Sequence, residues 1–417
     1  MTPAGPTGFE RREGELRCDG VSLADLAREH GTPLYVYSWA KIAESFQRFD
    51  SAFAGLPHLV CYAAKANSSL AILARLAALG AGADVVSGGE LRACLESGFP
   101  AERIVFSGVG KTDEEIRAGV EAGLLAFNAE SEREIARISD AAARASGRRA
   151  RVALRVNPDI DARSHPYIST GLKQNKFGVD IARAREIFER SRALPGVSMT
   201  GVQAHIGSQI LEAGPLVETA RALSSLAREL AAAGFPIETV DIGGGIGIGP
   251  GALTPEAYAK NVRPALDGLP GRLLVEPGRA IVGPAGALVT RVLGVKRERA
   301  KTFVVVDAAM NDLLRPALYE AVHPIEPVAA AARRPSIQAD VVGPVCETAD
   351  CFLHDAELPE TAEGELFAIL DAGAYGSAMS SNYNFRYRPA EVLVENGAAR
   401  RIRRRETFED LIRLEES

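Results

Sequence analysis

Between residues 59 and 278, short apolar runs alternate with longer amphipathic segments. The longer segments, such as 69–80 and 216–234, repeat apolar residues every three or four positions, which is typical of helices with one buried face. The short runs lie at 59–64, 83–87, 103–108, 124–129, 151–157, 199–207, 237–245 and 272–278. Apolar strands that alternate with such helices predict an α/β fold, with a parallel sheet covered by helices.

Eight strands in this order predict closure into a (β/α)8 TIM-like barrel over residues 37–285. An open doubly wound sheet is the competing arrangement. After about residue 285, strand-like runs follow one another with few helices between them. This change predicts a mostly antiparallel C-terminal β domain, a sandwich or barrel, over 286–417. The segment 1–36 leads into the strand-like "PLYVY" at 33–37, and we expect this segment to pack with the β domain.

Composition and charge exclude several classes of protein. The 417 residues suffice for two domains, and 47% apolar residues are too many for a disordered chain. Basic and acidic residues number 48 and 54 and are spread along the chain apart from "RRIRRR" at 400–405, so we expect no nucleic-acid partner. No apolar run has the length of a membrane span, and the N-terminal residues do not resemble a secretion signal.

The cysteines bear on compartment and metal binding. Five of them are scattered along the chain (Cys18, Cys61, Cys94, Cys346, Cys351), which is typical of a reduced, cytoplasmic protein without structural disulfides. No CxxC or HExxH spacing occurs, and the pair Cys346 and Cys351 alone is a weak zinc signal. We therefore expect no metal site.

Polar residues end nearly every predicted barrel strand. In such barrels the functional groups lie at the C-terminal ends of the strands, so these residues should share one rim. A lone buried lysine or histidine is more often structural, and the convergence of several groups is the stronger indication. The strand-end residues are Lys65, Ser87, Ser107, Asn128, Asn157, His205, the glycines 243–245 and Glu276.

Four of these features suit one cofactor. A desolvated Lys65 amine would act as a nucleophile toward a carbonyl. The run "DIGGGIGIG" at 241–249 can bring backbone N–H groups close to a phosphate, although a structural turn or a Rossmann-type turn would also use such glycines. Glu276 could keep a pyridine nitrogen protonated, and His205 could stack on a flat ring. Together they indicate pyridoxal 5′-phosphate (PLP).

A series of motifs then points to a known family. In chain order they are "YAAKAN", "DVVSGGEL", "STGLKQNKFG", "HIGSQ", "DIGGGIGI", "EPGR", "NDLLRPALY", "GPVCETAD", "GAY" and "SNYN". With this order and spacing, the chain resembles the diaminopimelate decarboxylase family, whose members are PLP-dependent and share the alanine-racemase-like fold (fold type III). The resemblance implies decarboxylation of meso-2,6-diaminopimelate to L-lysine, the last step of lysine biosynthesis.

The resemblance also implies roles for individual residues. Lys65 would bind the cofactor covalently, His205 would stack on its ring, and Glu276 would pair with the ring nitrogen. Cys346 would donate the proton that replaces carbon dioxide. Phosphate-side residues would be Ser208, Gly244, Gly245, Gly278 and Arg279. The unreactive end of the substrate would contact Arg279, Arg315, Tyr319 and Glu347, and Tyr375 would reach both cofactor and substrate. The family forms homodimers in which Cys346 and its neighbours complete the partner's site.

The residue chemistry separates this reading from its alternatives. An acid at 276 favours decarboxylation over racemisation, for which an arginine near the ring nitrogen is typical. Arg279 and Arg315 suit a distal carboxylate, which ornithine and lysine lack. A related decarboxylase acting on ornithine, arginine, carboxynorspermidine or a carrier-bound amino acid stays open. A non-catalytic PLP-binding homologue would be expected to have lost Lys65 or Cys346. One departure from the family pattern is Thr348-Ala349, where serine and a small residue are common.

Overall fold

A computed structural model describes residues 8–145, 149–162, 176–330 and 334–416. The chain forms two compact units, one of residues Ser45–Ala280 and one of Met1–Glu44 with Ile281–Ser417. We describe each unit by itself. The motif "STGLKQNKFG" lies largely outside the described residues, which resume at 176. Within the described residues, no helix combines the length and the apolar character that crossing a bilayer requires.

The first unit is a closed parallel barrel of eight strands. Hydrogen-bonded pairing runs from β9 through β11, β12, β13, β5, β6, β7 and β8 and returns from β8 to β9. The strands are β5 (His58–Ala63), β6 (Gly82–Val85), β7 (Ile104–Phe106), β8 (Ala126–Ala129), β9 (Ala150–Asn157), β11 (Val197–Gln203), β12 (Thr239–Asp241) and β13 (Arg272–Val275). The short β10 (Val179–Asp180) adds to β9. All eight predicted runs contain a barrel strand, so the open-sheet alternative is wrong.

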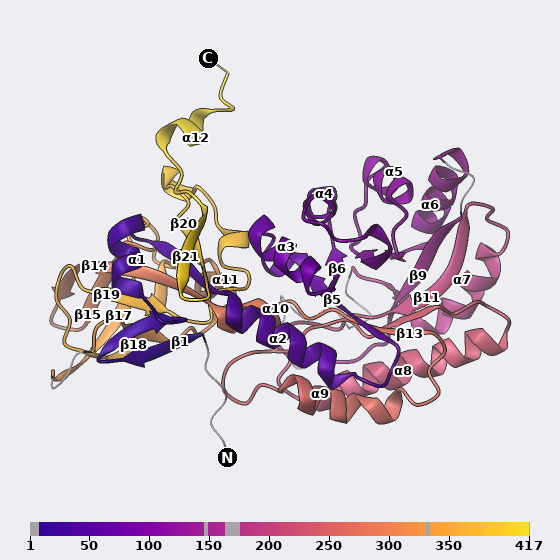
Figure 1. The fold of residues 1–417 in the computed structure, drawn as a ribbon, viewed down its shortest axis with the longest axis horizontal. Helices are drawn as coiled ribbons and strands as arrows, with labels where there is room; N and C mark the ends of the chain where they lie inside the picture. Colours follow the sequence, from indigo (N-terminus) through magenta and orange to yellow (C-terminus); the bar gives the residue numbers. More distant parts are fainter. Residues whose placement is uncertain (1–7, 146–148, 163–175, 331–333, 417) are drawn as a thin grey trace. The chain divides into compact units, whose positions relative to one another are not determined.

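Helices surround these strands, as Figure 1 shows. They are α3 (Leu70–Ala78), α4 (Gly88–Glu96), α5 (Asp113–Ala122), α6 (Glu132–Ala145), α7 (Ala184–Ser191), α8 (Ala213–Ala232) and α9 (Pro255–Val262), and α2 (Trp39–Ala52) precedes them in the chain. Local sequence sets where several begin. Thr112 and Glu115 form a reciprocal capping box at the start of α5, and Ser87 accepts the Glu90 N–H at the start of α4.

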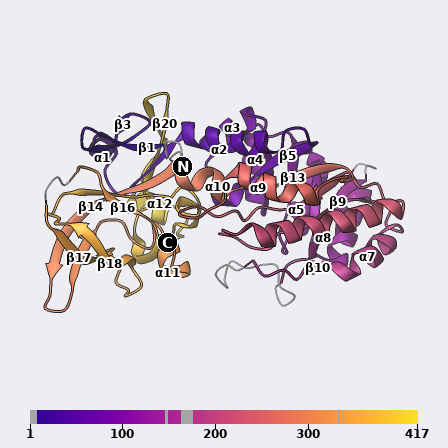
Figure 2. The ribbon, with the colours of Figure 1, turned by 90° about the horizontal axis from the view of Figure 1, so that it is seen from below.

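The second unit is a nine-stranded, mainly antiparallel sheet arrangement, which confirms the predicted β domain. β4 (Leu34–Ser38) pairs with β14 (Gly286–Arg297) and with β20 (Ala390–Glu395), as expected for "PLYVY". The other strands are β15 (Thr302–Val306), β16 (Ile325–Pro327), β17 (Ser336–Val342), β18 (Cys351–Pro359), β19 (Leu366–Ile369) and β21 (Ala398–Arg403). Among the described strands of this unit, only the pairs β15–β17 and β20–β4 are parallel. Figure 2 shows β17 and β18 side by side.

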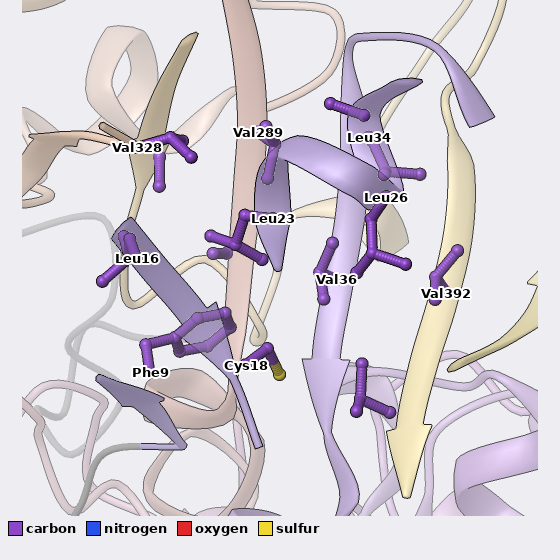
Figure 3. Packing of buried hydrophobic residues seen from close by; sticks show 14 of the residues in the cluster. Phe9, Leu16, Cys18, Leu23, Leu26, Leu34, Val36, Val289, Val328 and Val392 are labelled. Carbon is purple, nitrogen blue, oxygen red and sulfur yellow. The ribbon is translucent and has the colours of Figure 1, made fainter. Parts of the chain in front are cut away.

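Smaller elements complete this unit. A three-stranded antiparallel sheet of β1 (Phe9–Arg12), β2 (Glu15–Cys18) and β3 (Val21–Ser22) leads into α1 (Leu23–His30). The short helices α10 (Arg279–Val282), α11 (Arg315–Tyr319) and α12 (Phe408–Ile412) lie later in the chain. Figure 3 shows Leu23 beside Val289, and Phe9, Leu16 and Val392 belong to the same buried cluster. The segment before β4 is therefore part of the core of this unit.

Candidate functional site

Lys65 lies at the mouth of the barrel, in a single 3-10 turn (Ala64–Ala66) directly after β5. Its ammonium donates to Oδ2 of Asp84 at 2.8 Å, and the Asp84 side chain is completely buried on β6. Lys65, His205 and Glu276 line one cavity of about 280 Å³. The amine therefore faces a space near the usual lower size for ligand pockets, about 300 Å³.

Three glycines after β12 form a tight turn at the same rim. Gly243 and Gly245 have φ of +68° and +93°, which side chains with a Cβ rarely adopt. A Cβ on Gly244 would lie 2.0 Å from the carbonyl oxygen of Glu276, and one on Gly245 would lie 2.2 Å from that of Gly207. The turn is thus packed against the "HIGSQ" and "EPGR" segments so closely that glycine is required.

His205 follows β11 and is half-buried. The N–H of Gly244 donates to its Nδ1 at 3.2 Å, so this nitrogen acts as an acceptor. Burial, together with the charges of Lys65 and Arg155, lowers the pKa of His205 well below 6.5. The ring is therefore neutral and held in one orientation by the glycine turn.

Glu276 follows β13 and is almost completely buried. Its carboxyl accepts from the amides of Asn128 at 3.4 Å and Gln203 at 3.3 Å. Burial and the neighbouring Asp241 and Asp84 raise the pKa of Glu276 well above 4.5. A buried acid of this kind favours a cationic partner, because a nearby positive charge would stabilise its ionised form.

Ser208 and Arg279 meet beside these groups. Arg279 begins α10 and is buried, and its Nη2 donates to Oγ of Ser208 at 2.8 Å. Gly278, one residue earlier, is packed so that a Cβ would lie 3.0 Å from those of Ala63 and Ala66. The barrel unit therefore brings together Lys65, His205, Ser208, Gly244, Gly245, Glu276, Gly278 and Arg279. Of the other predicted strand-end residues, Ser107 lines the same cavity and Asn128 donates to Glu276. Ser87 instead caps α4, and Asn157 accepts the N–H of Asp159.

The other candidates lie on the β unit. Arg315 begins α11 and is buried, and its Nη1 donates to Nε2 of His323 at 2.9 Å. The second ring nitrogen of His323 lies 2.9 Å from the carbonyl oxygen of Leu370. His323 thus joins Arg315 to the end of β19. Tyr319, at the end of α11, is half-buried.

The loop that carries Cys346 and Glu347 exposes both residues. Asp350, at the end of this loop, is buried and accepts the N–H groups of Met310 and Val345, both at 2.7 Å. Asp350 is the aspartate of "GPVCETAD". Through these two bonds it closes the loop and holds Cys346 outward. Tyr375 is half-buried with φ of +56°.

Sequence reasoning missed several groups at the barrel mouth. Asp84, Gln203 and Asp241 contact the predicted residues but lie within the strands rather than at the first polar position after them. The sequence could have indicated Asp84 and Asp241, since a charged residue inside an apolar strand is rarely buried without a functional or paired role. Burial raises the pKa of Asp241 to about 6, although the hydrogen bond that its carboxylate accepts from the Gly243 N–H acts to lower it.

Comparison with known proteins agrees with this geometry. Residues 39–283 match the family described as "Pyridoxal-dependent decarboxylase, pyridoxal binding domain". The residues present fit such a cofactor: the mouth offers a lysine amine, a glycine turn with no room for side chains, and a buried acid that favours a cation.

Relatives that match nearly the whole chain identify the family more specifically. Diaminopimelate decarboxylase of Aquifex aeolicus is 46% identical over 97% of this chain and 96% of the relative. That of Neisseria meningitidis serogroup A is 49% identical over 94% and 97%. The chain belongs to the diaminopimelate decarboxylase family. The structure of the Helicobacter pylori family member complexed with L-lysine has a TM-score of 0.90 at 44% identity, covering 94% of this chain and 98% of that one.

A second structure with bound lysine extends the comparison. The diaminopimelate decarboxylase of M. jannaschii, in co-complex with L-lysine, has a TM-score of 0.93 at 39% identity and covers 98% of each chain. Lysine decarboxylase of Selenomonas ruminantium has a TM-score of 0.80 at 24% identity, and this likeness concerns the fold alone. The fold type III resemblance drawn from the motifs is therefore confirmed, and the chain is a PLP-dependent decarboxylase by family.

Proposed function

We propose that this enzyme decarboxylates meso-2,6-diaminopimelate to L-lysine and carbon dioxide, the last step of lysine biosynthesis. The observation that carries the proposal is Lys65 beside the same cavity as Glu276 and His205, in a chain that aligns with diaminopimelate decarboxylases over nearly its full length. Two relatives of known structure were solved with L-lysine, the expected product.

The barrel residues would hold PLP. Lys65 would bind it covalently, the 244–245 turn with Ser208, Gly278 and Arg279 would contact its phosphate, and His205 would cover its ring. When bound, the cofactor supplies an electron sink for the bond that breaks on loss of carbon dioxide. Glu276, buried among acids, would be ionised by a cationic ring nitrogen and would keep that nitrogen protonated.

The substrate would be recognised at its unreactive end. Arg279 and Arg315 offer forked donors to a distal carboxylate, and Glu347 accepts from a distal ammonium. Tyr319 and Tyr375 are proposed to line the same substrate. A substrate without a distal carboxylate would leave two guanidinium groups unmatched, which disfavours lysine and ornithine relative to meso-diaminopimelate.

Cys346 would donate the proton to the carbon that loses carboxylate, since a positioned thiol can act as a general acid. We propose that it does so across a homodimer. Exposed aromatic side chains support this, because Tyr383 and Phe385 are 47% and 56% exposed and Asn384 between them accepts from the Cys346 N–H. A hydrogen bond to Glu347 raises the pKa of Tyr383, so this tyrosine adjoins the same loop.

A cytoplasmic location is also proposed. All five cysteines lie in the described part of the chain and are free thiols. Such usage is typical of reducing compartments.

The experiment is to incubate the purified protein with PLP and meso-diaminopimelate, L-lysine or L-ornithine and to measure released carbon dioxide. Turnover should be fastest with meso-diaminopimelate. Lys65→Ala should lose both turnover and the long-wavelength absorbance of bound cofactor, whereas Lys260→Ala, an exposed lysine on α9, should keep both. Wild-type turnover in Lys65→Ala, or a preference for ornithine, would refute the proposal.

A further inference from the structure

Three potential metal ligands meet on the β unit, and none of them is among the proposed cofactor or substrate residues. Asp340 lies on β17, and Cys351 and His354 lie on β18. Nδ1 of His354 is 3.0 Å from Oδ2 of Asp340 and 3.4 Å from Sγ of Cys351. All three ligand atoms lie within 4.8 Å of one another. One imidazole nitrogen therefore faces both a carboxylate and a thiol.

An irregularity in the β17–β18 pairing creates this cluster. Positions three apart on a regular strand point to opposite faces of the sheet, so Cys351 and His354 would normally be separated. Here the register shifts on both sides of Val341, so that Asp340 lies opposite both His354 and Asp355. The N–H of Asp355 donates to Oδ1 of Asp340 at 2.8 Å and fixes that carboxylate. Bulges of this kind redirect side chains and often occur beside functional sites.

The spacing suits a small tetrahedral cation. With the usual zinc bond lengths, tetrahedral geometry places a sulfur and a nitrogen ligand about 3.6 Å apart and a nitrogen and an oxygen ligand about 3.4 Å apart. The observed 3.4 and 3.0 Å need to open by only a few tenths of an ångström. The exposed imidazole, 72% accessible, can make that adjustment, and Asp340 is held by the sheet.

A cation already occupies the outer side of the cluster. The Lys301 ammonium lies 2.9 Å from Oδ2 of Asp340 and 3.4 Å from Oδ1 of Asp355. This ammonium ends a flexible, partly exposed side chain, so a metal ion could displace it toward solvent. Asp355 or water would then be available as the fourth ligand.

We propose that Asp340, Cys351 and His354 form a binding site for Zn²⁺ or a similar thiophilic divalent cation. Binding releases the Cys351 thiol proton to solvent, and the resulting thiolate, the imidazole and the carboxylate coordinate the ion. Cys351 directly follows Asp350, which closes the loop carrying Cys346. The ion would therefore tie β17 to β18 at the base of that loop. The site is chemically independent of the proposed decarboxylation.

Co²⁺ titration of the chelator-treated holoenzyme tests the proposal, because its tetrahedral ligand-field bands lie at longer wavelengths than the absorbance of the cofactor. We expect one Co²⁺ per chain, displaced by Zn²⁺, and a higher Tm of the wild type with Zn²⁺. His354→Gln changes an exposed side chain and should still fold. Both His354→Gln and Cys351→Ser should weaken Co²⁺ binding at least about tenfold. Removing a residue that only hydrogen-bonds a metal ligand already has an effect of this size, and these variants remove a ligand itself.

Two further variants make the test specific. Lys301→Met removes the competing ammonium and should tighten Co²⁺ binding about two- to fivefold, as expected from the strength of exposed ion pairs. Cys346→Ser removes the other accessible thiol and should leave the Co²⁺ bands unchanged. The proposal fails if the tetrahedral bands survive in Cys351→Ser, disappear in Cys346→Ser, or never form in the wild type.

Discussion

His323 offers a sharp test of the substrate-binding proposal, because it hydrogen-bonds Arg315 and is not itself a proposed substrate contact. The His323 ring is 1% exposed, and it lies 2.9 Å from Arg315 on one side and 2.9 Å from the Leu370 carbonyl on the other. Since Nη1 of arginine is always a donor, Nε2 of His323 accepts and Nδ1 donates to the carbonyl. His323→Leu removes both bonds, whereas His323→Gln keeps an acceptor and a donor on one side chain.

The expected magnitude follows from the type of bond. A hydrogen bond to a charged group contributes about 1.5–3 kcal/mol, and a buried donor that loses its acceptor costs a similar amount. If half of that energy holds Arg315 in its binding orientation, KM for meso-diaminopimelate should rise about three- to tenfold in His323→Leu. kcat should change little, because the proposed contact of Arg315 with the unreactive end of the substrate would be the same in the ground and transition states.

Steady-state kinetics of the wild type, His323→Leu and His323→Gln measure KM and kcat, and circular dichroism measures whether each protein is folded. His323→Gln should recover most of the wild-type KM, and all three should bind PLP with the same absorbance. A merely structural role would lower the folded fraction and kcat without a selective rise in KM. An unchanged KM in a folded His323→Leu enzyme would therefore refute the reasoning.

Three other predictions address separate parts of the chain. Cys346→Ala should keep the cofactor absorbance but lower kcat about 10²-fold or more, the usual contribution of a positioned acid, and a wild-type rate in stopped-flow assays would exclude it as the donor. Asp350→Ala should leave the Met310 and Val345 N–H groups without their acceptor, costing about 1–3 kcal/mol in urea unfolding and lowering kcat, whereas stability within error of wild type would contradict the anchoring role. In the cofactor-free chain, Asp241→Asn should raise the free energy of unfolding above about pH 6. Burial raises the pKa of Asp241 from its usual 3.8 to about 6, so the folded state binds the proton more tightly and loses stability as the pH rises through this window, by roughly 3 kcal/mol for a shift of about two units. The variant should show a flatter stability profile between about pH 4 and 7, and a profile parallel to wild type would count against a raised pKa.

Much of the fold could be predicted because its signals are local. Apolar runs and amphipathic segments indicated all eight barrel strands and the change to a β-rich segment after about residue 285. The strand β18 is harder to recognise from sequence, because "CFLHDAELP" mixes charged and apolar residues without regular alternation and its pairing with β17 is bulged. Register shifts depend on the partner strand and leave little trace in one sequence.

The sequence by itself determined which groups share the barrel rim. Strand ends in a closed parallel barrel meet at one edge, so Lys65, His205, the glycine turn and Glu276 follow from their places after apolar runs. Only the tertiary structure decided which distant side chains become partners. Asp84 joins Lys65, His323 joins Arg315, and Asp340 meets Cys351 and His354, because each contact depends on how two separate strands or loops are paired and how deeply water is excluded between them.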